Sequence, residues 1–194
     1  MIDILADRLV RIPATVVAAT LVVGSLLADV HTFVTVPAMD GMEPAQWTAR
    51  IGIMLYFLVL PIALLAVWAR RRDALGRLGL AAAVLIAIQV LCYLLLTVAM
   101  VGWGLLLGRG DLSDSVMWVE SLGVSSFYLG VIILAVRLLF AGRANAVIGA
   151  LLLAGFLVSF VMPFGLTVAI AVLAAVFVVH EAGSGAEAAA LQAH

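Results

Sequence analysis

Four ionisable residues of this sequence lie within or beside long apolar segments: Asp29, His31, Arg50 and Glu120. Such positions are costly for a charged group inside a membrane, so the groups found there are often functional. Desolvation favours the neutral form of a carboxylic acid, which can then act as a general acid, and an imidazole can relay protons near neutral pH. We therefore take Asp29, His31 and Glu120 as candidate catalytic residues and Arg50 as a candidate ligand-binding residue.

Polar side chains at helical spacing could line a ligand cleft near these groups. Gln89, Tyr93 and Thr97 follow one another at offsets of four, so they share one face of a helix. Ser125 and Tyr128, three residues apart, share a face of another segment. We take these five residues as further ligand-binding candidates.

The catalytic candidates also have a purely structural interpretation. Asp29 and His31 are two residues apart, so a regular helix points them in different directions and a direct pair is not expected. Asp29 or Glu120 could instead pair with Arg50 from another segment. The alternative is that these groups only hydrogen-bond between helices or contact interfacial water. The tryptophans predicted at the same depth are typical of a membrane-interface belt: Trp47, Trp103 and Trp118.

Several chemistries find no support in the sequence. His31 offers a nitrogen ligand, and oxygen ligands are offered by Asp29, Asp40, Glu43 and Glu120, but no HxxxH or HExxH spacing accompanies them, so no metal site is predicted. The single cysteine, Cys92, excludes an intramolecular disulfide and a CxxC pair. No nucleotide-binding motif and no basic tract typical of nucleic-acid binding occurs. We predict neither a cofactor nor a nucleic-acid partner.

The elements that must position these residues are membrane helices. Hydrophobic residues make up 66% of the 194 and charged residues only 11%, with a mean hydropathy of +1.31. Soluble domains carry roughly 45–50% apolar and about 25% charged residues. Several apolar runs exceed the roughly 20 residues that cross a bilayer as a helix. The sequence therefore predicts an all-α, polytopic transmembrane bundle with the lipid bilayer as its surroundings.

We predict about six spans in a single domain. Pro37 closes the first span, Pro61 kinks the second, and the Met162–Gly165 break divides a last apolar stretch that is too long for one crossing. Residues 1–12 precede the bundle and are not interpreted as a cleavable signal peptide. An Ala-, Gly- and Ser-rich tail, 181–194, is expected to be flexible. The predicted spans are 13–36, 47–69, 78–103, 116–140, 144–161 and 164–180. Five spans with a re-entrant last segment remain an alternative.

The arginines predict the orientation. All ten basic residues are arginine. With a cytoplasmic N-terminus, only Arg50 and Arg109 fall outside, whereas the other eight fall inside, as the positive-inside rule requires. Both termini are then cytoplasmic, and the four ionisable candidates lie beneath the outer surface. The residues predicted inside are Arg8, Arg11, Arg70, Arg71, Arg72, Arg77, Arg137 and Arg143.

The whole pattern resembles an uncharacterised bacterial family of six-span membrane proteins, a domain of unknown function. The resemblance covers most of residues 13–180. It rests on a polar-interrupted first span and its short loop to Trp47–Ile51, on LGLAAAVLIAIQVLCYLLLT at Leu78–Thr97, and on ESLGVSSFYLGVIILAVRLLF at Glu120–Phe140 with a closing hairpin. It implies a location in the bacterial cytoplasmic membrane and carries over no assigned activity.

The sequence is compatible with more than one class of function. The first hypothesis is a non-enzymatic membrane protein that binds a small hydrophobic molecule or a membrane-protein partner, because the loops are short and catalytic motifs are absent. The second is a small enzyme that cyclises or isomerises a lipid, quinone or isoprenoid by acid catalysis. A transporter or channel is disfavoured, because the sequence has few charges at mid-membrane depth and no convincing inverted repeat.

Overall fold

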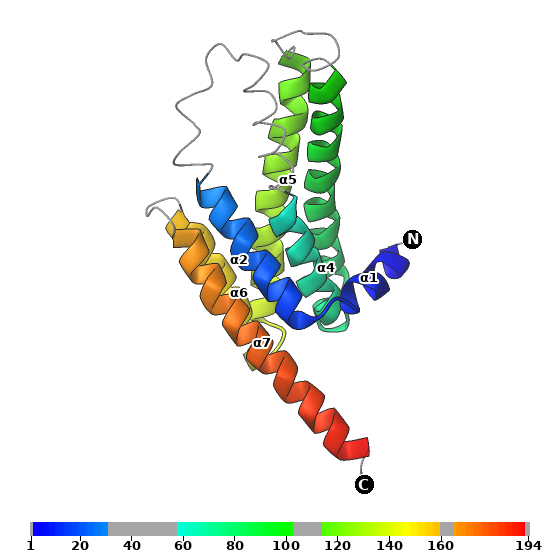
Figure 1. Ribbon diagram of the computed structural model, residues 1–194, viewed down its shortest axis with the longest axis vertical. Helices are drawn as coiled ribbons and strands as arrows, with labels where there is room; N and C mark the ends of the chain where they lie inside the picture. Colours follow the sequence, from blue (N-terminus) through cyan, green and yellow to red (C-terminus); the bar gives the residue numbers. More distant parts are fainter. Residues whose placement is uncertain (1, 31–57, 103–113, 160–164, 193–194) are drawn as a thin grey trace.

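The computed structural model of the chain describes residues 2–30, 58–102, 114–159 and 165–192. Every regular element in these ranges is a helix, as the composition predicted. Figure 1 shows the longer helices lying side by side as a bundle, with the short α1 pointing outward beside its lower end. The helices are α1 (Ile2–Val10), α2 (Ala14–Val30), α4 (Val59–Met100), α5 (Asp114–Leu139), α6 (Arg143–Ser159) and α7 (Gly165–Gln192).

Helix α4 consists of two limbs, 59–75 and 77–100, that run in opposite directions. Gly76, between them, has φ 59° and ψ −152°, a conformation that glycine adopts easily and other residues rarely. Figure 1 shows the chain reversing at the lower end of the bundle. A straight helix of 42 residues would measure about 63 Å, twice the thickness of a bilayer core. The reversal at Gly76 lies inside the segment 70–77 that was predicted as a loop. The first limb nevertheless stays helical as far as residue 75.

Helices α2, α4, α5 and α7 all contribute large side chains to the core of the bundle. Leu21 of α2, Leu64 and Ile86 of the two limbs of α4, Leu134 of α5 and Phe177 of α7 are almost completely buried. The five side chains belong to one continuous cluster of buried residues. This interdigitation is the packing that holds membrane helices together in the absence of a strong hydrophobic driving force.

Small residues on α5 allow its close approach to α4. A Cβ added to Gly123 would lie 2.9 Å from the Cβ of Cys92, and one added to Gly130 would lie 3.0 Å from the carbonyl oxygen of Ala82. Ser126, between them, is buried. Small residues of this kind are typical of closely packed membrane helices.

Two stretches of the described chain are long and apolar enough to cross a membrane, Val59–Ala99 in α4 and Trp118–Leu139 in α5. A third is added if the bent pair Ile4–Val10 and Ala14–Leu27 forms one span. Asn145–Val158 and Thr167–Ala182 are apolar but shorter. Large apolar side chains are exposed along the outside of the bundle, as lipid contact requires. The structure thus has the features of a membrane protein, although this criterion counts fewer than the six predicted spans.

Both ends of the chain contain helix that the sequence analysis did not anticipate. Residues 2–10, expected only as a cytoplasmic N-terminus, form α1, which is bent by 96° from α2 and buries Ala6 and Leu9. The tail, expected to be flexible from 181, instead continues α7 to Gln192 and projects from the bundle in Figure 1. Its alanines, with Leu191 and Gln192, are strong helix formers, which explains the difference.

Candidate functional site

The eight arginines within the described residues all lie at one end of the bundle, which we call the arginine end. The connection between α1 and α2, the reversal of α4, the connection between α5 and α6, and the later part of α7 meet there (Figure 1). Contacts between these segments tie them together: Arg72 pairs with Asp7, and Arg137 Nε donates to the carbonyl of Leu75 at 3.3 Å. Arg50 and Arg109 lie outside the described residues. These eight arginines thus lie at one end of the bundle, and the side of the membrane on which they lie stays a prediction.

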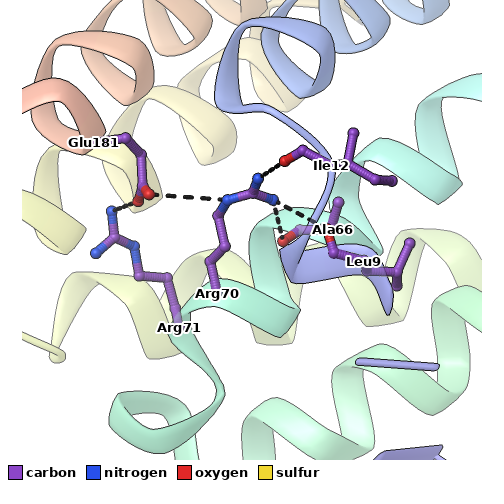
Figure 2. A network of polar contacts seen from close by, with 6 residues as sticks. All are labelled: Leu9, Ile12, Ala66, Arg70, Arg71 and Glu181. Carbon is purple, nitrogen blue, oxygen red and sulfur yellow. Dashed lines mark hydrogen bonds and ion pairs between the residues drawn. The ribbon is translucent and has the colours of Figure 1, made fainter. Parts of the chain in front are cut away.

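Arg70 holds the α1–α2 connection against α4. Its guanidinium donates to the carbonyl oxygens of Leu9 and Ala66, both at 3.4 Å, and to that of Ile12 (Figure 2). Leu9 lies in the last turn of α1 and Ile12 in the connection that follows, so a buried charged donor helps to satisfy carbonyls beyond the regular part of the helix. The side chain is only 7% exposed and lies 5.7 Å from the centre of the Phe177 ring, close enough for a cation–π contact.

Glu181 of α7 contacts the part of α4 that contains Arg70 and Arg71. Its carboxylate oxygens lie 2.5 Å from Arg71 Nη2 and 3.8 Å from Arg70 Nε, so one carboxylate bridges two guanidinium groups (Figure 2). The Glu181 side chain is half-buried, and the arginine side chains are more buried still. A charge-assisted contact of this length in a partly desolvated position is stronger than an exposed ion pair.

Arg72 completes the network on the side of α1. Its Nη1 donates to Asp7 at 3.0 Å, and its Nε lies 3.8 Å from Asp73. Both pairs are more exposed than the Arg71–Glu181 pair, so each contributes little to stability. Arg70, Arg71 and Arg72 thus reach three different parts of the chain from consecutive positions.

These residues surround an open pocket of about 930 Å³, the arginine pocket. Its walls are the α1–α2 connection with the first turn of α2, residues 69–73 of α4, and α7 near Glu181. The charged residues of the lining are Arg11, Arg70, Arg71 and Arg72 with Asp7, Asp73 and Glu181, four positive against three negative groups. Within the described chain, the buried Nε of Arg71 has no acceptor. The pocket therefore offers unused donors to an anion.

A smaller apolar groove of about 250 Å³ lies between α1 and the two limbs of α4. Leu5 of α1, Leu65 and Trp68 of the first limb, and Val84 and Leu91 of the second are among its lining residues. Almost no polar surface lines it, so the groove suits the apolar part of a molecule. The indole N–H of Trp68 is buried and has no acceptor among the residues that the structure describes.

The polar stripe predicted on the second limb divides between two environments. Gln89 and Tyr93 are buried. Tyr93 lies close to α5, because a Cβ added to Gly123 of α5 would lie 3.5 Å from the Tyr93 ring. Thr97 donates its hydroxyl to the carbonyl of Tyr93 at 2.7 Å, within its own helix. The Oε1 of Gln89 has no partner in the described ranges. Within this stripe, Tyr93 belongs to the α4–α5 interface.

The candidates on α5 lie nearer its surface. Glu120 is half-buried, and Ser125 and Tyr128 are exposed. The Tyr128 ring packs edge-on against Phe156 of α6, with the ring centres 4.9 Å apart. This contact places Tyr128 beside α6. The predicted part of the α5 candidates in ligand binding stays a prediction.

The outer cluster predicted from the sequence falls mostly outside the described residues. His31 and Arg50 lie there, as do Asp40 and Glu43. Asp29 lies in the last turn of α2, where only its backbone is described. Among the residues that the structure does describe, no three His, Cys, Asp or Glu side chains gather as a metal site would require.

Comparison of the chain with protein-family models, with curated proteins and with solved structures gives no match. The resemblance to the six-span bacterial family therefore stays a prediction. The residues themselves therefore define the class of protein and its candidate sites. The described chain is all-helical with apolar helices, and it has an arginine end, an arginine pocket and an apolar groove.

Sequence analysis missed the carboxylates of the arginine end. It interpreted Arg70, Arg71 and Arg72 only as an orienting loop. The signal was nevertheless available, because the predicted topology places Asp7 and Glu181 on the same side of the membrane as that loop. Opposite charges at the same depth on three separate segments are a reason to expect ion pairs between them.

Proposed function

We propose that this chain is a multi-pass integral membrane protein of the bacterial cytoplasmic membrane, with six spans and both termini in the cytoplasm. Membership of the six-span family that its sequence resembles is part of that proposal. The gathering of eight arginines at one end supports the orientation, because arginines flanking short loops stay on the cytoplasmic side. Both α1 and the later part of α7 lie at that end (Figure 1).

The reversal of α4 supports a count above the two or three stretches that length and composition alone single out. The limbs 59–75 and 77–100 measure about 26 Å and 36 Å, so each suits one crossing of a core of about 30 Å. Helix α5 adds a further crossing. Helices α2 and α6, with 17 residues each, reach the lower limit for a crossing, and α7 exceeds it.

We propose further that the protein binds a small hydrophobic molecule, such as a lipid, a quinone or an isoprenoid, and does so without chemistry. The apolar groove carries this proposal. It is bounded by three helical segments, and its volume of about 250 Å³ fits a hydrocarbon chain or a small ring system. A groove of this kind favours a hydrophobic ligand over a protein partner, which would need a broad surface.

The groove also has a feature that a bare lipid-facing surface lacks. Trp68 is 5% exposed, yet its buried N–H has no acceptor within the described chain. An unpaired buried donor costs roughly 1–3 kcal/mol. A ligand that carries a carbonyl or hydroxyl oxygen could accept from this group after a small side-chain shift, which would favour an oxygenated hydrophobic molecule over a plain hydrocarbon.

Native mass spectrometry of the full chain in neutral detergent tests this function, with farnesol and decylubiquinone as probes. Val84→Trp should block the groove, whereas Val136→Trp on α5 is the matched control, since the two valines are 41% and 38% exposed and only Val84 lines the groove. We expect one-to-one adducts with the unaltered chain and the control, and clearly fewer with Val84→Trp. Equal adducts with both variants would contradict ligand binding in the groove. Chemical conversion of either probe would favour the enzyme hypothesis instead.

A further inference from the structure

The arginine pocket has the chemistry of an anion site. Arg71 keeps its Nε without an acceptor in the described chain, and the side chain of Arg11 lines the pocket with no hydrogen bond or ion pair to any residue that the structure describes. Arginine presents several N–H donors in a fixed fork that matches the oxygens of a carboxylate or a phosphate. Two of the four arginines therefore have donors to spare.

Glu181 shows where an anion lies in this pocket. Its carboxylate is held between Arg71 at 2.5 Å and Arg70 at 3.8 Å, the arrangement that a phosphate group would adopt between two guanidinium groups. The carboxylate comes from α7, whereas both arginines belong to α4 (Figure 2). Glu181 is therefore an internal anion that occupies a position suited to an external one.

The backbone of the pocket adds to this preference. The first turn of α2 lines it through Ala14 and Thr15. The carbonyl of Pro13 accepts hydrogen bonds from the N–H groups of Val16 and Val17, at 3.0 and 3.1 Å, so the turn is regular up to its start. The beginning of a helix carries a partial positive charge and favours a nearby anion.

The surroundings of the pocket favour a lipid as the source of the anion. Helix α1 points outward beside the arginine end with Ile4, Leu5 and Val10 exposed, as in helices that lie in a membrane interface. Val10 and Val178 are apolar parts of the lining of the pocket itself. An anionic headgroup can thus reach the arginines while its acyl chains stay on the apolar outer surface.

We propose that the arginine pocket binds the phosphate group of an anionic phospholipid, and that this phosphate competes with Glu181 for Arg71. The site is separate from the apolar groove and does not depend on the ligand proposed there. Basic pockets at the ends of membrane helices are recognised binding places for anionic headgroups. Here the ligand displaces a carboxylate of the protein, so its binding loosens the link between α4 and α7.

The competition predicts opposite effects for two kinds of substitution. Arg11→Gln removes a pocket donor that takes part in no ion pair of the described chain, so it should weaken lipid binding without disturbing the fold. Glu181→Gln removes the competing charge and should strengthen binding. Each effect should be about two- to fivefold, the range that one partly exposed charge pair supplies. Arg143→Gln is the matched control, since Arg143 is an exposed arginine at the same end that does not line the pocket.

The experiment measures binding of three probes to the full chain in neutral detergent: short-chain phosphatidylglycerol, phosphatidylcholine with the same chains, and inorganic phosphate. We expect phosphatidylglycerol to bind most tightly, Arg11→Gln to weaken this binding, Glu181→Gln to strengthen it, and Arg143→Gln to leave it unchanged. Equal binding of the two lipids, or an equal loss with Arg11→Gln and Arg143→Gln, would overturn the proposal. Weaker binding with Glu181→Gln would refute the competition, and inorganic phosphate that binds as tightly as phosphatidylglycerol would refute a lipid as the source.

Discussion

Arg71 and Glu181, 110 residues apart in the sequence, are joined by an ion pair of 2.5 Å between Nη2 and Oε1. The pair connects the reversal of α4 to the last helix of the bundle. Arg70, the preceding residue, shares the same carboxylate and also holds the α1–α2 connection through carbonyl oxygens. Two consecutive side chains thus fix three segments of the chain at one end.

Loss of the Glu181 charge should destabilise the fold. Glu181→Gln leaves Arg70 and Arg71 close together without a neutralising carboxylate, so we expect a loss of about 1–2 kcal/mol, between the values for exposed and buried pairs. The melting temperature of the chain in neutral detergent measures this. Asp73→Asn is the control, because the Asp73 side chain is fully exposed and its contact with Arg72 is 3.8 Å long. An equal fall in melting temperature for both variants would contradict the role of Glu181.

Arg70 should not tolerate replacement by lysine. Lysine keeps the charge, but a single ammonium group cannot reach the carbonyls of Leu9, Ile12 and Ala66 together as the guanidinium does. We expect Arg70→Lys to lower stability by about 2 kcal/mol, since buried carbonyls lose a charged donor. Arg77→Lys, at an exposed arginine of the same end, should leave the melting temperature unchanged. A tolerated Arg70→Lys would mean that charge alone matters here.

The close contact between α4 and α5 should be sensitive to one methyl group. A Cβ at Gly130 would lie 2.9 Å from Ile86 Cγ1 and 3.0 Å from the carbonyl oxygen of Ala82, so Gly130→Ala must separate the helices slightly. We expect a loss of about 1–3 kcal/mol, typical of overpacking. Gly102→Ala makes the same change where nothing lies within 4 Å, and its thermal stability should be unaltered or higher. Equal behaviour of the two variants would show that the interface can relax.

Sequence patterns were sufficient for the helical class of the protein and for the gathering of its arginines. Long apolar runs permit only helices in a membrane, and charge position follows from topology. Helix α1 was missed because Asp3, Asp7 and Arg8 interrupt its apolar residues within a single short segment. Such a helix is stabilised by its contact with α4, which no local pattern reveals.

The candidate sites also depend on contacts between distant segments. The role of Glu181 depends on a contact across 110 residues, and sequence spacing on one helix cannot reveal it. The groove beside Trp68 depends on how α1 lies across both limbs of α4. The predicted catalytic role of Asp29 and His31 stays a prediction, because no side chain of either residue is described.

The arginine end should lie on the cytoplasmic side of the membrane, and cysteine labelling in intact cells can determine this. Cys92→Ala removes the only native cysteine, after which Asp73→Cys marks a fully exposed side chain of the arginine end and Asp111→Cys marks the loop predicted outside. With a membrane-impermeant maleimide, we expect labelling at position 111 and none at 73 until the cells are permeabilised. Labelling at position 73 in intact cells would contradict a cytoplasmic arginine end.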